Sequence, residues 1–365
     1  MSYVHPFFDT NTYHKVKGRT SDEHTMGQSL FRYCDIKVHD LIKVNNLKRI
    51  NVIGKFDRQS NISKIEKDGK RFNYMRPTLT IKGGETADLE CYPGKDYIIQ
   101  FSDVLQTYFS DKKDVEIIPH FPTEEECWYE LEKSGILEIP SAENIILGYV
   151  ERYDTLSYEK EWQGNSYFKW KRCKKEYGDT LLVGCEHTYW GEIAGRIVSY
   201  FAEKGTSLII YSGKLGSLNY NHVPNNSIAT GNRSILPNFG VVEWENIFEN
   251  IAVDNIYKGN HITMPSVLQE TTQWRDNNLK LAEFVDPEIG HMALAAIQAG
   301  ITFSYLHVIS DNLALKFEAD LSNERKLSVR KNRERLYEII QTKISEELRR
   351  RTIIKNRMVE EREIV

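Results

Sequence analysis

The C-terminal three-fifths of the chain alternate continuous apolar runs with stretches of helical periodicity. Short apolar runs are typical of strands that are buried on both faces of a sheet. Strands are predicted at Asn144–Val150, Tyr167–Lys171, Thr180–Val183, Leu208–Tyr211 and Phe303–Ile309. Helices are predicted at Ile193–Glu203, ended by Gly205, and at Ile289–Ala299, ended by Gly300. This alternation predicts βαβ units, in which helices cover a central sheet.

The first 140 residues follow a different pattern, in which short β-like runs are separated by glycine-rich or charged turns. Strands are predicted at Arg49–Ile53, Thr78–Lys82, Tyr97–Phe101 and Val115–Pro119. Helices are predicted at Val104–Phe109 and at Glu124–Lys133, where Thr123 is the expected N-cap. Residues 1–30 have no regular pattern and are expected to form an irregular lead-in.

A change of pattern near Gly135, Pro140 and Ser141 indicates a domain boundary. The length of 365 residues also favours two domains. The expected division is an N-terminal α+β module of unknown role over 1–140, an α/β domain over 141–350 and a charged tail over 351–365.

Composition narrows the class of protein. Hydrophobic residues make up 40% of the chain, which is enough for a packed core, and the formal charge of −4 argues against a general nucleic-acid or membrane-surface binder. The chain has no run of 18 apolar residues, and its first 20 residues do not resemble a signal peptide. Five cysteines without a CxxC pair fit reduced thiols better than disulfides or a zinc site. We therefore expect a soluble, cytoplasmic protein with no membrane partner.

The segment Leu321–Arg351 predicts a highly charged helix whose apolar residues lie on one side. Those apolar residues are Leu336, Ile339, Ile340 and Ile344. The basic run Arg325–Arg335 would suit an RNA-binding adaptor, but it is interleaved with acids. A solvated, ion-paired helix face is the preferred interpretation, so nucleic acid is not an expected partner.

Two acids flank the helix predicted at Ile289–Ala299. Glu288 opens this helix, and Asp311 ends the next strand, 23 positions later (311 − 288). Ligands of parallel α/β sheets bind beyond the C-terminal ends of strands, where Asp311 is expected. Glu288 could accept both hydroxyls of a ribose 2′,3′-diol, and Asp311 could protonate a purine near N7 as the base leaves. Both groups would act on the oxocarbenium-like transition state of glycosidic cleavage.

The motif Val285-Asp286-Pro287-Glu288, followed by Ser310-Asp311, resembles the Val-Glu-Met-Glu and Ser-Asp segments of the nucleoside phosphorylase/nucleosidase superfamily. Its members include purine nucleoside and uridine phosphorylases, methylthioadenosine/S-adenosylhomocysteine nucleosidase and the catalytic domain of AMP nucleosidase. Tyr211–Leu218 looks like the glycine-bearing turn of this family, whose backbone lies against the base. The resemblance covers 143–345. It implies a central mixed sheet flanked by helices, and a homo-oligomer.

The resemblance also implies roles for single residues. Glu288 would bind the ribose diol, and Asp311 would donate a proton to the base. Further substrate-binding residues implied by the same motifs are Pro287, Ser310, Ser212, Gly213 and Gly216. His291 lies one turn after Glu288 and either faces the same pocket or is a hydrogen-bonded core histidine.

The nucleophile stays open between water and inorganic phosphate. Where the family has a glycine-bearing loop for phosphate or sugar, this chain has the bulkier Gly184–Trp190. Glu186 in this loop would repel an anion, which favours water. Residues that could act on the nucleophile are Glu151 or Asp154 and Glu186 for water, Thr188 in the same loop, and Arg152 for phosphate. No other cofactor and no metal is expected, because no His, Cys and acid cluster has ligand spacing.

The predicted activity is cleavage of the N-glycosidic bond of a purine nucleoside, nucleotide or derivative. The altered Gly184–Trp190 loop motivates one alternative, a non-catalytic nucleoside-binding regulatory protein on the same fold. This alternative stays open because a fold does not fix a function.

Overall fold

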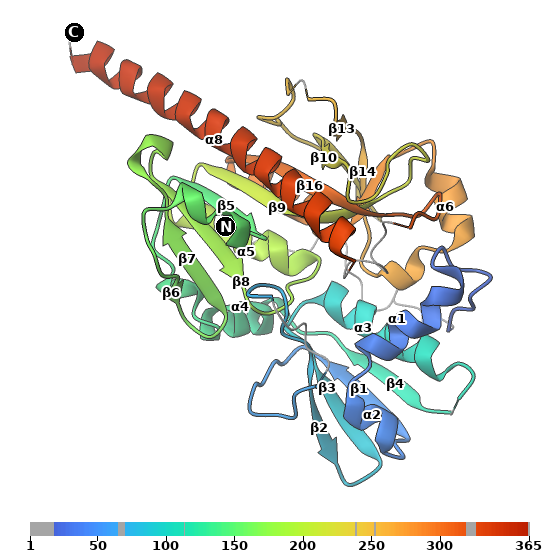
Figure 1. Cartoon of the computed structure of the whole chain (residues 1–365). Coiled ribbons are helices and arrows are strands. Elements are labelled where there is room, and N and C mark those ends of the chain that lie inside the picture. The colour runs from blue at the N-terminus through green and yellow to red at the C-terminus, as the bar shows by residue number, and fades with distance from the viewer. Residues whose placement is uncertain are drawn as a thin grey trace.

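The computed structural model describes residues 18–64, 70–112, 114–237, 239–251, 253–318 and 326–363 (Figure 1). The strands of these residues form a four-stranded sheet in the N-terminal part and a twelve-stranded sheet in the rest of the chain. This arrangement confirms the predicted α/β class, with a central mixed sheet flanked by helices.

The N-terminal part combines a small sheet with helices. Its elements are η1 (Gly27–Ser29), α1 (Leu30–Lys37), α2 (Asp40–Val44), β1 (Arg49–Ile53), β2 (Thr78–Lys82), β3 (Thr86–Glu90), α3 (Lys95–Phe109), β4 (Glu116–His120) and α4 (Glu124–Lys133). The strand order is β2-β3-β1-β4, with β1 parallel to both of its neighbours. Thr123 and Glu126 form a capping box at the start of α4, as the predicted N-cap requires.

The strand predicted at Tyr97–Phe101 is wrong, because these residues lie within helix α3. Their aromatic and β-branched side chains favour a strand locally. Burial decides the outcome instead, since Tyr97, Phe101, Leu105 and Tyr108 are buried at the spacing of a helix. The predicted helix Val104–Phe109 is therefore only the second half of a longer one.

The larger part of the chain follows α4. Its elements are η2 (Ile136–Glu138), β5 (Asn144–Gly148), η3 (Glu151–Leu156), β6 (Gln163–Gly164), β7 (Phe168–Arg172), η4 (Lys175–Tyr177), β8 (Thr180–Cys185), α5 (Glu192–Glu203), β9 (Leu208–Ser217), β10 (Ile228–Thr230), β11 (Arg233–Leu236), β12 (Gly240–Glu243), β13 (Ile256–Lys258), β14 (His261–Thr263), η5 (Val267–Gln269), α6 (Thr272–Asn278), β15 (Phe284–Asp286), α7 (Ile289–Ala299), β16 (Thr302–Asn312) and α8 (Leu327–Glu363). Strands β8, β5, β9 and β16 lie side by side and parallel at its centre.

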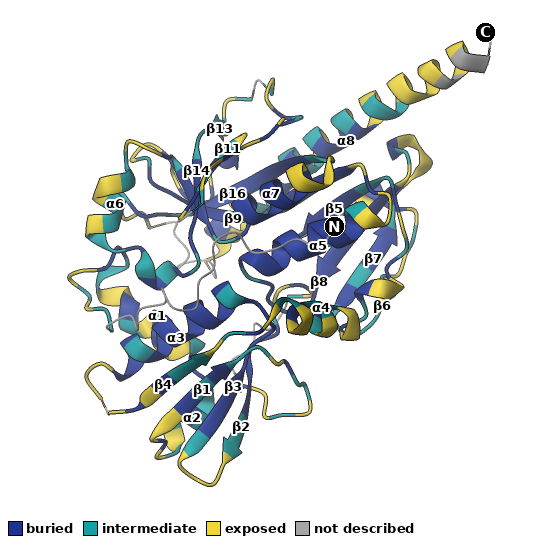
Figure 2. Cartoon of the chain, turned by 180° about the vertical axis from the view of Figure 1, so that it is seen from behind, coloured by how far each residue is buried: buried dark blue, intermediate teal, exposed yellow. Residues whose placement is uncertain are grey.

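Helices cover both faces of this central sheet (Figure 2). Successive residues of a strand point to opposite faces. Ile209 and Tyr211 belong to the core cluster that contains α5 and α7. Leu208 and Ile210 belong to the cluster that contains Leu336, Tyr337, Ile340, Ile344 and Leu348 of α8. The continuous apolar run of β9 thus follows from burial on both of its faces.

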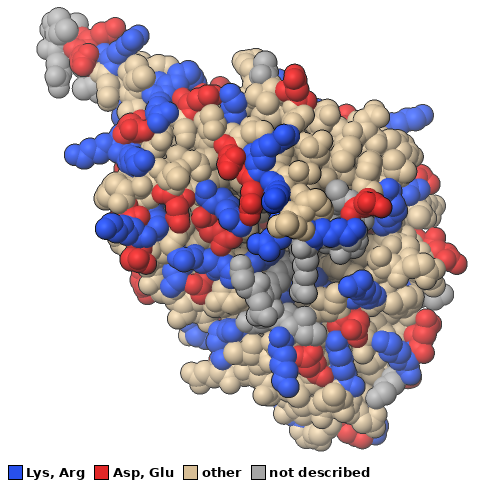
Figure 3. All heavy atoms as spheres, in the orientation of Figure 1, with Lys and Arg blue, Asp and Glu red and all other residues tan. Residues whose placement is uncertain are grey.

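Helix α8 is longer than predicted. The predicted start at Leu321 lies outside the described residues, and the helix continues through the predicted tail as far as Glu363. Its last turns project beyond the body of the molecule (Figures 1 and 2). On the face shown in Figure 3, basic and acidic side chains are interspersed. Among the described helices, none is long and apolar enough to cross a bilayer.

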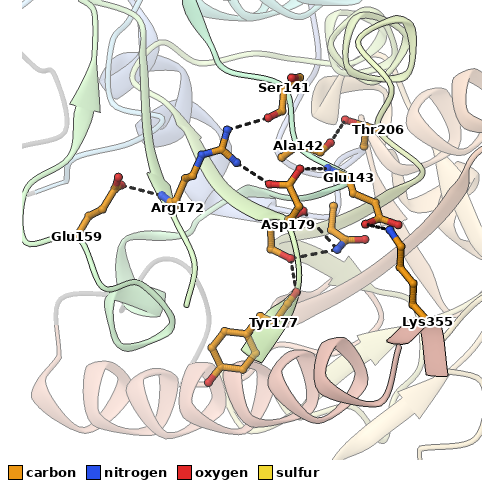
Figure 4. A network of polar contacts seen from close by, with 11 residues as sticks. Ser141, Ala142, Glu143, Glu159, Arg172, Tyr177, Asp179, Thr206 and Lys355 are labelled. Carbon is orange, nitrogen blue, oxygen red and sulfur yellow. Dashed lines mark hydrogen bonds and ion pairs between the residues drawn. The ribbon is translucent and has the colours of Figure 1, made fainter. Parts of the chain in front are cut away.

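The strand ends nearest the start of β5 carry a network of exposed polar contacts (Figure 4). Arg172 donates to Asp179 over 2.6 Å and to the carbonyl oxygen of Ser141 over 3.0 Å. Lys355 of α8 donates to Glu143 over 2.6 Å. These contacts tie β5, β7 and α8 together at the edge of the sheet where the parallel strands begin.

Candidate active site

Strand β9 differs from the prediction at the point where two other strands end against it. The predicted turn at Tyr211–Leu218 is wrong, because β9 continues as a strand to Ser217. Parallel β5 pairs with β9 up to Ser212, whereas antiparallel β15 pairs with it from Gly216 onward. The C-terminal ends of β5 and β15 therefore point toward each other along residues 213–215 of β9. Side chains that follow these two strands converge there.

Glu288 lies two residues after the end of β15 and is the N-cap residue of α7. It is only 7% exposed. Its carboxyl accepts hydrogen bonds from the backbone N–H of Gly191 and from the hydroxyl of Tyr211. Burial, and then the nearby charge of Asp286, raise the pKa of Glu288 well above its usual range. This shift favours the protonated carboxyl, and a neutral carboxyl can both donate and accept.

Asp286 fixes the start of helix α7. Its Oδ1 accepts hydrogen bonds from the backbone N–H groups of Glu288 and Ile289, over 3.0 and 2.9 Å. Nε2 of His261 lies 2.9 Å from the same oxygen, and Ser234 contacts the other ring nitrogen of His261 over 2.9 Å. This buried chain of polar contacts orients the backbone that carries Glu288.

Asp311 lies on the other side of β9 from β15. Gly216 pairs with Val285 of β15 on one edge and with Asp311 of β16 on the other. Two strand spacings of about 4.8 Å thus separate the backbones of Val285 and Asp311. A Cβ on Gly216 would lie 3.2 Å from Oδ2 of Asp311, so a glycine lets this carboxyl lie against the strand. Ser310 donates to Asp311 over 2.7 Å.

A second acid lies near Asp311. Glu270 is buried, and burial, followed by the charge of Asp311, raises the pKa of Glu270 well above its usual range. Its backbone carbonyl accepts hydrogen bonds from both the N–H and the hydroxyl of Thr25. A residue that the N-terminal part holds in place therefore lies near Asp311, at the predicted base-binding end.

Gly213 brings the backbone of β9 against His307. Its N–H donates to Nδ1 of His307 over 3.2 Å, and a Cβ at this position would lie 3.1 Å from Nε2. Nδ1 is thus the acceptor, and Nε2 carries the hydrogen in the neutral ring. Within the described part of the chain, this Nε2 and Oδ2 of Asp286 have no hydrogen-bond partner, and they lie 4.0 Å apart. Buried polar atoms without partners mark a place for a water molecule or a ligand atom.

Two of the predicted residues take other positions. Ser212 lies on the α8 side of the sheet, where its hydroxyl contacts that of Tyr153 over 2.5 Å. Pro287 is half-buried between the two acids of its motif. The structure therefore groups Glu288, Asp286 and Gly213, and places Asp311 and Ser310 on the opposite edge of β9, with Gly216 between the two edges.

The loop after β8 pairs with the N-terminal part. Thr188 donates both its N–H and its hydroxyl to the carbonyl oxygen of Met75. The carbonyl of Glu186 accepts from the N–H groups of Tyr74 and Met75. The carboxyl of Glu186 is nearly buried, accepts from the Tyr74 hydroxyl over 3.3 Å and has a pKa raised by burial. The N–H and hydroxyl of Thr188 and the carbonyl of Glu186 are thus already used within the protein.

Glu151 and Arg152 lie in η3, just after β5. Glu151 accepts a hydrogen bond from the backbone N–H of Arg71 over 3.2 Å. Arg152 is exposed and faces Glu334 of α8 at 3.8 Å, on the side of the sheet away from α7. The structure does not bring Arg152 together with Glu288.

Sequence reasoning missed three residues at the Glu288 end, namely Asp96, Gly191 and His307. Gly191 has a positive φ of 60°, and Asp96 lies 3.0 Å from His291. Asp96 was hidden by the wrong strand at Tyr97–Phe101, since an acid in the first turn of a helix would have been a signal. His307 lies within a correctly predicted strand, and no neighbouring sequence motif indicates that it belongs to a site.

The site thus belongs to an α/β protein and contains two buried acids, Asp286 and Glu288, where β5 and β15 end. No protein-family model matches the chain. The protein named oxidoreductase cns1 from Cordyceps militaris is 23% identical over 323 residues, which cover 76% of this chain. The matched region makes up 41% of that protein, so the chain spans less than half of its length.

Solved structures similar to the chain include a nucleosidase and a nucleoside phosphorylase. The methylthioadenosine/S-adenosylhomocysteine nucleosidase of Campylobacter jejuni matches with a TM-score of 0.45 and 13% identity, over 57% of this chain and 100% of its own. The purine nucleoside phosphorylase of Toxoplasma gondii matches with a TM-score of 0.45 and 14% identity, over 59% of this chain and 94% of its own.

Proposed function

We propose that the chain cleaves the N-glycosidic bond of a purine nucleoside, nucleotide or derivative, and that water is the nucleophile. The observation that carries this proposal is the register around Gly216. It places the Asp286–Glu288 segment on one edge of β9 and Asp311 on the other. A nucleoside that spans the strand would meet one acid at its ribose and the other at its base.

At the base end, Asp311 is the proposed general acid. Purine leaves readily only when a ring nitrogen takes up a proton, which a carboxyl group beside the base can supply. Asp311 is half-buried, and the buried acid Glu270 lies near it. The backbone of Gly213–Gly216 is the surface against which the base would lie.

At the ribose end, Glu288 is the proposed ligand of the diol. The neutral carboxyl can accept a hydrogen bond from one hydroxyl and donate to the other. As positive charge develops on the sugar, the ionised form of this buried acid becomes more favourable, so its interaction strengthens in the transition state. Asp286 adds a second acid beside it.

The proposed choice of water follows from the loop after β8. A phosphate needs backbone N–H groups or cations that face it. The N–H of Thr188 donates to Met75 instead, and Glu186 adds an acid to the loop. Arg152, the predicted phosphate ligand, faces α8.

A second candidate is a nucleoside-binding regulatory protein without catalysis. It is favoured by the burial of Glu288, whose carboxyl is already bonded to Gly191 and Tyr211. A ligand would have to replace or extend these contacts.

Release of free base separates the two candidates. Purine and pyrimidine nucleosides, their 5′-phosphates and 5′-thio derivatives would be incubated with the protein, with and without inorganic phosphate, and analysed by chromatography. Release that does not depend on phosphate supports the hydrolase. Phosphate-dependent release would contradict the choice of water, and nucleoside binding without release from any substrate would favour the regulatory protein.

A further inference from the structure

The N-terminal ends of helices α3 and α5 cap each other across the two parts of the chain. Oε1 of Glu192, in the first turn of α5, accepts a hydrogen bond from the backbone N–H of Lys95 over 2.6 Å. Oδ2 of Asp96, in the first turn of α3, accepts one from the backbone N–H of Glu192 over 3.0 Å. Each helix therefore supplies an acid to the free N–H groups of the other.

Gly191 lets Asp96 come this close to α5. A Cβ at Gly191 would lie only 2.3 Å from Oδ2 of Asp96, and the residue adopts a φ of 60° that favours glycine. Its own N–H donates to Glu288. Successive N–H groups, of Gly191 and then of Glu192, thus hold Glu288 and Asp96 side by side.

His291 closes this arrangement into a ring. Its Nε2 lies 3.0 Å from Oδ2 of Asp96, and both side chains are buried. Residues three apart on a helix lie on the same face, so His291 is a neighbour of Glu288 at the start of α7. Contacts run from Glu288 through Gly191 and Glu192 to Asp96, and from Asp96 through His291 back to α7.

We propose that Asp96 is a positioning residue of the active site, which fixes Glu288 and His291 at the ribose end, so that the N-terminal part is a component of the site. This inference rests on the proposed function for the identity of the ligand at Glu288. It gives a role to the first 140 residues, for which the sequence offered none.

The role of Asp96 can be measured through the pKa of Glu288, which depends on the charges around it. The groups that face Glu288 are Asp286 from the end of β15, Asp96 from α3, Tyr211 from β9, Tyr189 from the loop before α5 and His291 from α7 itself. Besides burial and Asp286, the negative charge of Asp96 contributes to the raised pKa of Glu288. Removing that charge should therefore lower the pKa of Glu288.

The two parts of the chain stay joined without the charge of Asp96. Gln100 accepts a hydrogen bond from the backbone N–H of Val267 over 3.0 Å, and Asp103 accepts one from Gln269 over 3.1 Å. In Asp96→Asn, the amide oxygen can still accept from the N–H of Glu192. Asp103→Asn is the matched control, because Asp103 is a buried acid of the same helix that also bonds to the larger part.

The test is a titration of the full chain labelled with ¹³C at the glutamate carboxyls, with Glu288 assigned through Glu288→Gln. We expect the pKa of Glu288 to fall by about one unit in Asp96→Asn and to stay unchanged in Asp103→Asn. We also expect kcat/KM for base release to fall about tenfold in Asp96→Asn only. An unchanged Glu288 titration would overturn the inference, whether or not the protein releases base. A lowered pKa without base release in the parent protein would support the role of Asp96 and count against the proposed function.

If Asp96→Asn does not fold, His291→Gln gives a second test. The Gln amide can still donate to Asp96, but the imidazole next to Glu288 is lost. A several-fold rise in KM at unchanged melting temperature is expected. An unchanged KM would show that His291 is not placed at the ribose end.

Discussion

The two ends of the central sheet use acids in opposite ways. Where the parallel strands begin, Asp179 is 53% exposed and pairs with Arg172, which is 36% exposed. Where β5 and β15 end, Glu288 and Asp286 are 7% and 4% exposed. At the first end, the carboxylate is stabilised by an ion pair that is exposed to water. At the second end, buried carboxyls are stabilised by hydrogen bonds from backbone N–H groups.

The two ends differ in how the protein offsets the free-energy cost of a charged side chain. An exposed ion pair contributes about 0–1 kcal/mol to stability, since water screens both partners. A buried carboxyl without partners is far more costly, so it either receives hydrogen bonds or keeps its proton. Asp286 has two N–H donors, whereas Glu288 has one N–H, one hydroxyl and a raised pKa. Buried acids with a pKa shifted by their surroundings, such as Glu288, are typical of sites that do chemistry.

The largest expected effect is at Asp311. Asp311→Asn removes the proposed general acid, and kcat/KM for base release should fall by about 10²- to 10⁴-fold. Initial rates over a pH series would measure this loss. Retention of more than a tenth of the activity would show that another group protonates the base.

Glu288→Gln should lower kcat/KM by about 10- to 100-fold, corresponding to about 1.5–3 kcal/mol for a hydrogen bond to a charged group. The amide keeps the hydrogen-bonding shape but cannot ionise as the sugar becomes positive. The loss should therefore appear mainly in kcat. A rise in KM alone would mean that Glu288 binds the ground state and the transition state equally.

Gly191 and Gly205 both have a positive φ and lie at opposite ends of the sheet, so the effects of substituting them on stability can be compared. Gly191→Ala should lower the free energy of unfolding by about 1–3 kcal/mol, because the φ of 60° is strained and the new Cβ would meet Asp96. Gly205 has a φ of 92° with no atom within 4 Å of an added Cβ. Gly205→Ala should therefore be destabilising through strain alone, without loss of base release. Denaturant unfolding measures both variants, and equal activity losses would contradict the distinction.

The burial of His187, in the loop after β8, should make the free energy of unfolding depend on pH. Burial lowers its pKa to about 3, and neither ring nitrogen has a partner within the described part of the chain. Because its folded pKa is below the unfolded value of 6.5, the unfolded chain takes up the proton first, and stability is lost as the pH falls below about 6.5. His187→Phe keeps a ring against Tyr92 and cannot take up this proton.

Relative to the parent, the His187→Phe variant should gain about 2 kcal/mol more at pH 5 than at pH 8. Denaturant unfolding at the two pH values measures this difference. An equal gain at both would mean that His187 does not titrate on unfolding.

The smallest effect is expected at the exposed end. Asp179→Asn removes the charge that pairs with Arg172 and should change the free energy of unfolding by about 1 kcal/mol or less. Its activity should equal that of the parent. A clear loss of base release would show that the two ends of the sheet are coupled, and would break the comparison.

Much of the central sheet was predictable because its signals are local. The apolar runs at β5, β8 and β16 and the periodicity of α7 located these elements, and the motif from Val285 to Glu288 indicated one acid of the site. The continuation of β9 through Gly213 and Gly216 was not predictable, since both glycines read as turn residues. Their actual role is close approach to His307 and Asp311, which only the tertiary fold defines.

The part of the site that comes from the N-terminal region was not predictable for a related reason. Asp96 and His291 are 195 residues apart (291 − 96), and their contact depends on the packing of α3 against α5 and α7. A pattern within one segment carries no information about such a contact. The misassigned strand at Tyr97–Phe101 removed the only local signal, an acid in the first turn of a helix.

The most direct test of the central claim compares base release by three variants, Glu288→Gln, Asp311→Asn and Asp179→Asn, beside the parent chain. We predict phosphate-independent release of purine by the parent and by Asp179→Asn, and loss of this release in Glu288→Gln and Asp311→Asn. Release that persists in Glu288→Gln and Asp311→Asn, or that is absent from the folded parent on every substrate, would contradict the claim that this end of the sheet cleaves glycosidic bonds.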